Sequence, residues 1–279
     1  MNTAMHTSAA KAALQFYLDS GVDEALSAEP LNKVSRDGNV LLGEKKHPAP
    51  TPTPGAHNPL LGKSDARIEA VKLASAAQTP EDLRAAIAGF GGIAIKKTAT
   101  NLVFCDGNPK APVMLVGEAP GADEDRQGKP FVGVSGQLLD RILKCIDLER
   151  TEENPAQSIY ISNILNWRPP GNRTPAPAEV EVSLPFIERH IQIIRPKLLI
   201  FCGGVSAKAL LGSDESVSRL RNKWHDYLPQ TPEYRENAKP IPAIATYHPA
   251  YLLRTPAQKK AVWTDMLAVQ ARRRELGLL

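Results

Sequence analysis

Four short apolar runs, separated by amphipathic stretches, dominate the second half of the chain. They predict buried strands over residues 112–117, 158–165, 197–204 and 242–247. The stretches between and after them space their apolar residues as helices do, over residues 135–148, 177–195, 205–212 and 255–276. Strands that alternate with helices favour a parallel sheet covered on both faces. The pattern therefore predicts an α/β fold of three layers, α/β/α, around a central four-stranded parallel sheet.

The first part of the chain has a different organisation. Residues 7–27 have the composition of a helix, and residues 28–62 include the proline-rich run "HPAPTPTPGAHNP", which favours an extended linker. Two further helices are predicted at 64–77 and 79–90, because each segment begins with a residue suited to N-capping. We thus expect an N-terminal helical extension with its linker over 1–62, and one α/β domain over 63–279.

Polar and glycine-rich segments come directly after each of the four predicted strands. In chain order they read "GEAPG", "NWRPPGNR", "GG" and "HPAYLLR". In sheets of this kind ligands bind beyond the carboxyl ends of the parallel strands, where such segments meet. We therefore expect the four segments to line one shared pocket.

Four side chains in and near these segments suit a flat, polar ligand. Glu118 offers a carboxylate that can position a water or act as a base, and Phe131 lies on a glycine-flanked loop where its ring can stack on a nucleobase. Asn163 offers a paired donor and acceptor, which matches the edge of uracil and rejects the inverted pair of cytosine. His248 can stabilise a carbonyl oxygen that gains negative charge. Each residue alone is at least as typical of an ordinary turn, core or strand-end position; together they indicate a site.

Charge and cysteine content narrow the class of protein. The formal net charge of +4 is compatible with a polyanionic partner without requiring one. The segment "YLLR" joins apolar side chains to Arg254, and such a loop can wedge into a base stack and hold phosphates. The three irregularly spaced cysteines disfavour a disulfide framework and exclude a four-thiolate metal centre within one chain. The N-terminus has no long apolar run, so we expect no signal peptide or membrane span, and a cytoplasmic monomer.

Taken together, these segments resemble the uracil-DNA glycosylase superfamily, and most closely its family 4, the bacterial and archaeal iron–sulfur branch. The resemblance covers about residues 88–270 and is carried, in the family's order, by "GEAPGADEDRQGKPFVG", "YISNILNWRPPGNRTP", "RPKLLIFCGG", "SRLRNKWHDY" and "TYHPAYLLR". It implies a DNA repair enzyme whose partner is uracil-containing DNA, single- or double-stranded. The implied reaction flips the base out of the DNA and hydrolyses its N-glycosidic bond, leaving an abasic site.

The resemblance also implies roles for individual residues. Glu118, Asn163 and His248 are the implied catalytic residues. For the acid that positions water we choose Glu118, with Asp123, Glu124 and Asp125 left open as alternatives close in sequence. The implied uracil-binding residues are Gly117, Ala119, Gly121, Glu124, Phe131, Asn163 and His248. The implied DNA-binding residues are Ser135, Arg168, Tyr251, Leu253 and Arg254.

The chain departs from family 4 at the iron–sulfur cluster. Members of that branch usually hold the cluster with four cysteines, and those positions fall here near Phe90 and at Ile93, Trp167 and Ser183. None of the four is a cysteine, and such a cluster requires thiolates. We therefore predict no metal and no cofactor, and we expect Trp167 to fill the vacated volume by apolar packing.

Two other classes of function compete with uracil excision. One is a protein that binds uracil in DNA without turnover, since one superfamily branch becomes covalently trapped on DNA through a histidine in an inserted basic loop. The corresponding segment here, "NWRPPGNRTPAP", has neither the insert nor a histidine. The other is a nucleotide-dependent α/β enzyme, but the chain carries no P-loop and no Rossmann fingerprint. Uracil excision remains the prediction.

Overall fold

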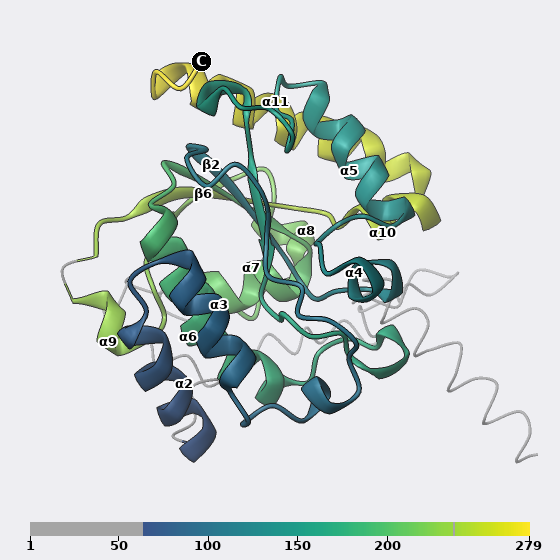
Figure 1. The fold of residues 1–279 in the computed structure, drawn as a ribbon. Coiled ribbons are helices and arrows are strands. Elements are labelled where there is room, and N and C mark those ends of the chain that lie inside the picture. The colour runs from purple at the N-terminus through teal and green to yellow at the C-terminus, as the bar shows by residue number, and fades with distance from the viewer. Residues whose placement is uncertain (1–63, 237) are drawn as a thin grey trace, which may run out of the picture. The chain divides into compact units, whose positions relative to one another are not determined.

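The computed structural model describes residues 64–236 and 238–279, which form three layers around one sheet (Figure 1). The predicted helix at 7–27 and the linker at 28–62 lie outside the described residues. The sheet has six strands in the order β1-β3-β2-β4-β6-β5. They are β1 (Asp106–Gly107), β2 (Val113–Gly117), β3 (Tyr160–Asn163), β4 (Leu198–Cys202), β5 (Trp224–Tyr227) and β6 (Ile241–Thr246).

The four predicted strands form the centre of the sheet and are parallel to one another, as expected. Strand β2 pairs with β3 on one side and with β4 on the other, and β4 pairs with β6. Two short strands, β1 and β5, add antiparallel edges that the apolar pattern does not predict. The reason is physical: β1 has only two residues, and β5 is largely exposed at the edge, so neither carries an apolar run.

Helices cover both faces of the sheet (Figure 1). One face is covered by α2 (Asp65–Ala76), α3 (Pro80–Gly89), α6 (Pro177–Ile194) and α7 (Gly204–Leu211). The other face is covered by α5 (Val134–Lys144), α10 (Pro249–Arg254) and α11 (Lys259–Glu275). Three short helices, α4 (Ala122–Gln127), α8 (Val217–Leu220) and α9 (Pro232–Arg235), belong to the connections. Within the described residues, no helix is both long enough and apolar enough to cross a membrane.

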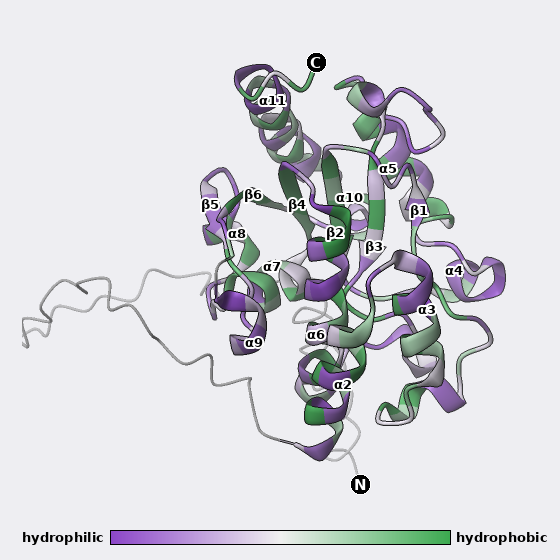
Figure 2. Ribbon diagram, turned by 60° about the vertical axis from the view of Figure 1, so that its left-hand side comes forward, coloured by the Kyte–Doolittle hydropathy of each residue, from purple (hydrophilic) through white to green (hydrophobic). Residues whose placement is uncertain are grey.

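The alternation of side chains along β2 divides the core in two. Met114 and Val116 pack in the cluster under α2, α3, α6 and α7, whereas Val113 and Leu115 pack in the cluster under α5, α10 and α11. Successive side chains of a strand point to opposite faces, so a strand covered on both faces is apolar throughout. The central strands are accordingly green in Figure 2, and purple polar residues lie on the surrounding helices and loops.

Helix boundaries follow the capping residues. Ser64 accepts a hydrogen bond from the N–H of Arg67 at the start of α2, and Thr79 forms a reciprocal capping box with Asp82 at the start of α3. Both helices therefore begin within one residue of the prediction. Helix α11 begins later than predicted because Pro256–Gln258 form a separate 3₁₀ turn ahead of it.

Candidate active site

The carboxyl ends of the four parallel strands bring the predicted loops together. Gly117 ends β2 and lies in register with Asn163, which ends β3. A side chain on Gly117 would collide with both the Asn163 Oδ1 atom and the Phe131 ring, so these two groups lie directly over its backbone. The Phe131 ring in turn stacks on the His248 imidazole, with ring centroids 5.4 Å apart. After β4, a Cβ added to Gly203 would lie 3.3 Å from the His248 Cβ. The ends of β2, β3 and β4, the Phe131 loop and the start of α10 thus meet, whereas none of these contacts involves the segment 166–173.

Asn163 presents an unpaired acceptor to this site. The residue is only 2% exposed, and its Oδ1 atom accepts no hydrogen bond from any described residue. A buried polar atom without a partner costs about 1–3 kcal/mol, so its presence needs an explanation. The explanation that fits this position is a donor supplied by a ligand.

His248 is held as a neutral donor. It is the N-cap of α10, where its Nδ1 atom accepts a hydrogen bond from the N–H of Ala250 at 3.2 Å. In the neutral ring the proton is then on Nε2. Burial, followed by the positive charge of Arg254, lowers the pKa of His248 to about 4. At neutral pH the ring is therefore uncharged and offers a fixed Nε2–H donor.

Within the described residues, the Glu118 side chain makes no hydrogen bond. Glu118 follows Gly117 at the end of β2, and its backbone carbonyl accepts the N–H of Leu165 at 3.0 Å. Burial raises the pKa of its carboxyl group to about 7. A general base works best when its pKa lies near the operating pH, so Glu118 is suited to that task.

Glu124 holds together two loops of the candidate site. Its Oε1 atom accepts the N–H groups of Val132 and Gly133, both at 2.9 Å, and its Oε2 atom accepts the N–H of Gly121 at 3.1 Å. One buried carboxylate therefore joins the loop after β2 to the loop that carries Phe131. Because both carboxylate oxygens accept backbone N–H groups, Glu124 supports these two loops.

The other two acids considered from the sequence also have partners. Asp125 is buried and accepts the N–H groups of Thr100 and Asn101 at 2.8 and 3.0 Å. Asp123 pairs with Arg126 at 2.6 Å, and both side chains are exposed. Among the four acids, the arrangement thus favours Glu118 for contact with a water.

The residues predicted to contact DNA lie on two neighbouring helices and one loop. Leu253 is 44% exposed, and Arg254 follows it as the last residue of α10. Helix α10 packs against α5, whose first turn holds Ser135. Tyr251 packs its ring against Tyr247, with centroids 5.0 Å apart. On the loop after β3, the Arg168 side chain donates a hydrogen bond to the Asn172 side chain.

Ala119, which the sequence predicts to bind uracil, packs against the hydrophobic core under α2 and α6.

The four positions that match the cluster cysteines of family 4 form part of a packed interior. Phe90, Ile93 and Trp167 are buried in one hydrophobic cluster, and Ser183 is buried on α6. The Phe90 ring meets the Phe186 ring edge-on, with centroids 5.2 Å apart. Iron–sulfur clusters are held by thiolates, so these side chains do not fit one.

The three cysteines do not replace the missing ligands. Cys202 is buried in β4, Cys105 is half-buried before β1, and Cys145 is exposed at the end of α5. Burial raises the pKa of the Cys202 and Cys105 thiols, which disfavours thiolates at both. Within residues 64–236 and 238–279, no group of three or more His, Cys, Asp or Glu side chains is placed to hold a metal ion.

Trp167→Ala is expected to lower the free energy of unfolding by about 3–5 kcal/mol, because it removes a large side chain from the packed interior. Urea denaturation followed by circular dichroism measures the change. Trp263→Ala is the matched control, since Trp263 is 43% exposed on α11 and its loss leaves no cavity. Equal losses in the two variants would show that Trp167 does not fill this volume.

Known proteins are similar to this chain over the whole region that contains the site. The sequence model described as the uracil DNA glycosylase superfamily matches residues 104–267. The type-4 uracil-DNA glycosylase of Pyrobaculum aerophilum is 38% identical over 172 residues, which cover 62% of this chain and 83% of that protein. The type-4 uracil-DNA glycosylase of Archaeoglobus fulgidus is 37% identical, covering 61% and 81%. That of Thermotoga maritima is 35% identical, covering 56% and 73%.

Proposed function

Because the chain belongs to the uracil DNA glycosylase superfamily, we propose that it removes uracil from DNA by hydrolysing the N-glycosidic bond of a flipped-out nucleotide. This proposal rests on one observation. The Asn163 amide and the Phe131 ring lie over the backbone of Gly117, and the Phe131 ring stacks on the His248 imidazole. A buried acceptor, an aromatic ring and a neutral donor at one place are what a single uracil requires. The type-4 relatives support the same activity.

Recognition of the base uses Phe131 and Asn163. The ring stacks on the face of uracil, as aromatic side chains do on unstacked bases. The unpaired Oδ1 of Asn163 accepts the ring N–H of uracil, and the amide N–H donates to the neighbouring carbonyl. Cytosine presents the opposite arrangement and would leave both groups unpaired. Gly117 leaves room for the Asn163 amide and the Phe131 ring themselves, because a side chain there would collide with both.

Breaking the bond places positive charge on the sugar and negative charge on the carbonyl oxygens of uracil. The Nε2–H of His248 donates to one of these oxygens and stabilises the leaving base. Because the pKa of His248 is lowered to about 4, the ring acts as a neutral donor and transfers no proton in this step. The base leaves as an anion, which takes its proton from solvent.

The second half of the reaction adds water to the sugar. The Glu118 carboxylate accepts a proton from a water molecule as the oxygen of that water bonds to the sugar carbon. The carbon–nitrogen bond breaks, a carbon–oxygen bond forms, and the product is an abasic site. Protonated Glu118 cannot accept this proton, so the reaction requires its ionised form.

The rate of excision is expected to rise with pH through about 7 and then level off. This follows because the pKa of Glu118 is raised to about 7, so the ionised base predominates only above that pH. His248, with its pKa near 4, adds no step between pH 5 and 9. Single-turnover rates measured from pH 5 to 9 test this. Glu118→Gln is expected to be slow and to lack the rise; an unchanged rise in that variant would show that another group is titrating.

DNA binding is proposed to use the surface of α10 and α5. Leu253 enters the base stack at the position of the extruded nucleotide, while Arg254, Ser135 and Arg168 contact phosphates and Tyr251 supports the loop. Extrusion costs a few kcal/mol in duplex DNA and is easiest where the base is unpaired, so both single- and double-stranded substrates are accepted.

The proposed activity is tested with oligonucleotides that carry one uracil, or cytosine or thymine at the same position. Protein purified free of iron is incubated with each in the presence of EDTA, and abasic sites are revealed by cleavage in alkali. We expect cleavage of the uracil strand. The alternative, a protein that binds uracil without turnover, predicts DNA retained by the protein on a native gel, or joined to it covalently on a denaturing gel, and no abasic product. Failure to cleave the uracil strand would overturn the proposed activity.

A further inference from the structure

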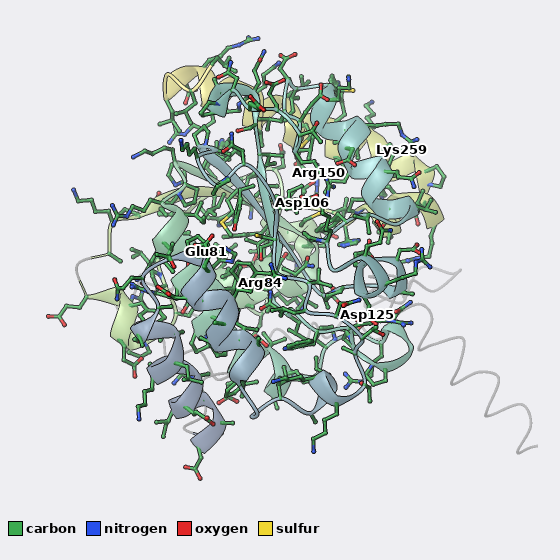
Figure 3. The ribbon with its side chains drawn as sticks, viewed as in Figure 1. Glu81, Arg84, Asp106, Asp125, Arg150 and Lys259 are labelled. Carbon is green, nitrogen blue, oxygen red and sulfur yellow. The ribbon has the colours of Figure 1, made fainter. Side chains whose placement is uncertain are left out.

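Arg150 makes a set of contacts that the function described above does not use. It lies in the loop between α5 and β3, and its side chain is only 10% exposed. Its Nε and Nη2 atoms bind Asp140 at 2.9 and 2.7 Å. Its Nη1 atom binds Asp106 of β1 at 3.2 Å, and both residues are labelled in Figure 3. The same guanidinium donates to the backbone carbonyls of Pro130 at 2.8 Å and Phe131 at 2.9 Å. One side chain thus joins β1, α5 and the loop that carries Phe131.

The backbone of Phe131 needs such support. Its φ angle is +53°, in the left-handed region, where a residue with a Cβ stays only when its neighbours hold it. The carbonyls of Pro130 and Phe131 belong to the two peptide planes on either side of the Phe131 α-carbon. By binding both carbonyls, Arg150 fixes both planes and hence the backbone angles that aim the ring.

Two further contacts hold the backbone of the Phe131 loop. The peptide between Phe131 and Val132 is held at its other end by Glu124, which accepts the Val132 N–H at 2.9 Å. Gly136, in the first turn of α5, packs so closely on the Phe131 carbonyl that a Cβ there would overlap it. The loop is therefore held from both sides, and Arg150 is its only charged donor among the described residues.

An arginine is suited to this position for two reasons. Its planar guanidinium presents several N–H groups in a fixed fork, so it reaches two carbonyls and two carboxylates at once. Asp140 and Asp106 balance its charge, so the buried cation is paired. A lysine carries the same charge but cannot offer this fork.

We propose that Arg150 is a positioning residue for uracil excision: it locks the Phe131 loop so that the ring is aimed into the base pocket before DNA binds. The proposal rests on the stacking role of Phe131 in the proposed function. Arg150 does not touch the base, and its effect on excision passes through Phe131.

A double-mutant cycle tests this route. Single-turnover excision is measured at saturating enzyme for the wild type, Arg150→Met, Phe131→Ala and the double variant. Loss of base–aromatic stacking typically costs about fivefold to a hundredfold, and we expect Arg150→Met to fall in that range. Because both substitutions remove the same stacking contact, the double variant is expected to be no slower than Phe131→Ala. Arg150→Lys, which keeps the charge, is expected to be slowed as well.

Two controls separate positioning from other effects. Arg84→Met removes an exposed positive charge from α3, on the face of the sheet opposite α5 and α10, and is expected to leave excision unchanged. Affinity for DNA that carries an abasic site, which has no base to stack, is expected to be the same in Arg150→Met and the wild type. The proposal is overturned if the losses multiply in the double variant, or if Arg150→Met and Arg150→Lys excise at the wild-type rate while Phe131→Ala is slow. Wild-type speed in Phe131→Ala would refute the stacking role itself, whereas an inactive wild type would refute the proposed function.

Discussion

Replacing His248 by alanine is expected to lower the rate of uracil excision by about 10²–10³-fold while the fold remains intact. The loss follows from the Nε2–H donor, which stabilises a carbonyl oxygen of the base only as that oxygen becomes negative. Such a group lowers the barrier without strengthening binding of the substrate, so the change should appear in the single-turnover rate and not in the affinity for uracil-containing DNA.

His248 also caps α10, so its removal has a structural effect that must be separated from the catalytic one. His248→Asn keeps a side chain that is favourable at an N-cap, but it cannot place a donor where Nε2 lies. We expect this variant to be nearly as slow as His248→Ala and more stable to heat. His225→Ala is the control for loss of a histidine, because His225 lies on the edge strand β5. Excision by His248→Asn at the wild-type rate would remove His248 from the mechanism.

The second large effect is expected at Asn163. Asn163→Leu keeps a side chain of similar volume but removes both the acceptor and the donor that read the base edge. Two polar groups of a bound uracil then lose their partners, at about 1–3 kcal/mol each, so excision should slow by about a hundredfold or more. Stability should not fall with it, because the wild-type Oδ1 atom is buried and unpaired in the free protein. An unchanged or raised melting temperature together with slow excision is the expected combination.

Asn166 provides a matched control for that result. It is also buried, three residues further along, but its Nδ2 atom donates to the carbonyl of Val103 at 3.0 Å. Asn166→Leu should therefore lose stability and keep its excision rate per folded molecule. If Asn163→Leu instead behaves like Asn166→Leu, with lower stability and normal excision, Asn163 is a structural residue and the base is read elsewhere.

Much of the sheet could be predicted because its central strands are buried on both faces. Val113, Leu115 and their neighbours form an uninterrupted apolar run, and such runs alternate with amphipathic helices along the chain. The edge strands could not be found in the same way. Strand β5 exposes Trp224 at the sheet's margin, so its pairing depends on β6 and leaves no apolar run in the sequence.

The site shows the same division between local and tertiary information. Asn163 ends a predicted strand, His248 closely follows one, and Phe131 stands in the glycine-rich motif that begins at Gly117, which is why their meeting could be expected. The contacts of Arg150 could not be expected, since its partners lie 10 to 44 residues away along the chain. The raised pKa of Glu118 likewise depends on burial, which only the folded chain provides. Sequence motifs thus predict which groups meet at the pocket, while tertiary contacts decide how they are held and charged.

The most direct test is a crystal structure of His248→Asn bound to DNA that contains one uracil. The account predicts an extrahelical uracil with its face on the Phe131 ring, its polar edge against the Asn163 amide and a carbonyl oxygen facing the position that Nε2 of His248 occupies in the wild type. It also predicts Glu118 on the side of the sugar. A uracil that remains stacked in the DNA, or that binds away from the ends of β2, β3 and β6, would contradict it.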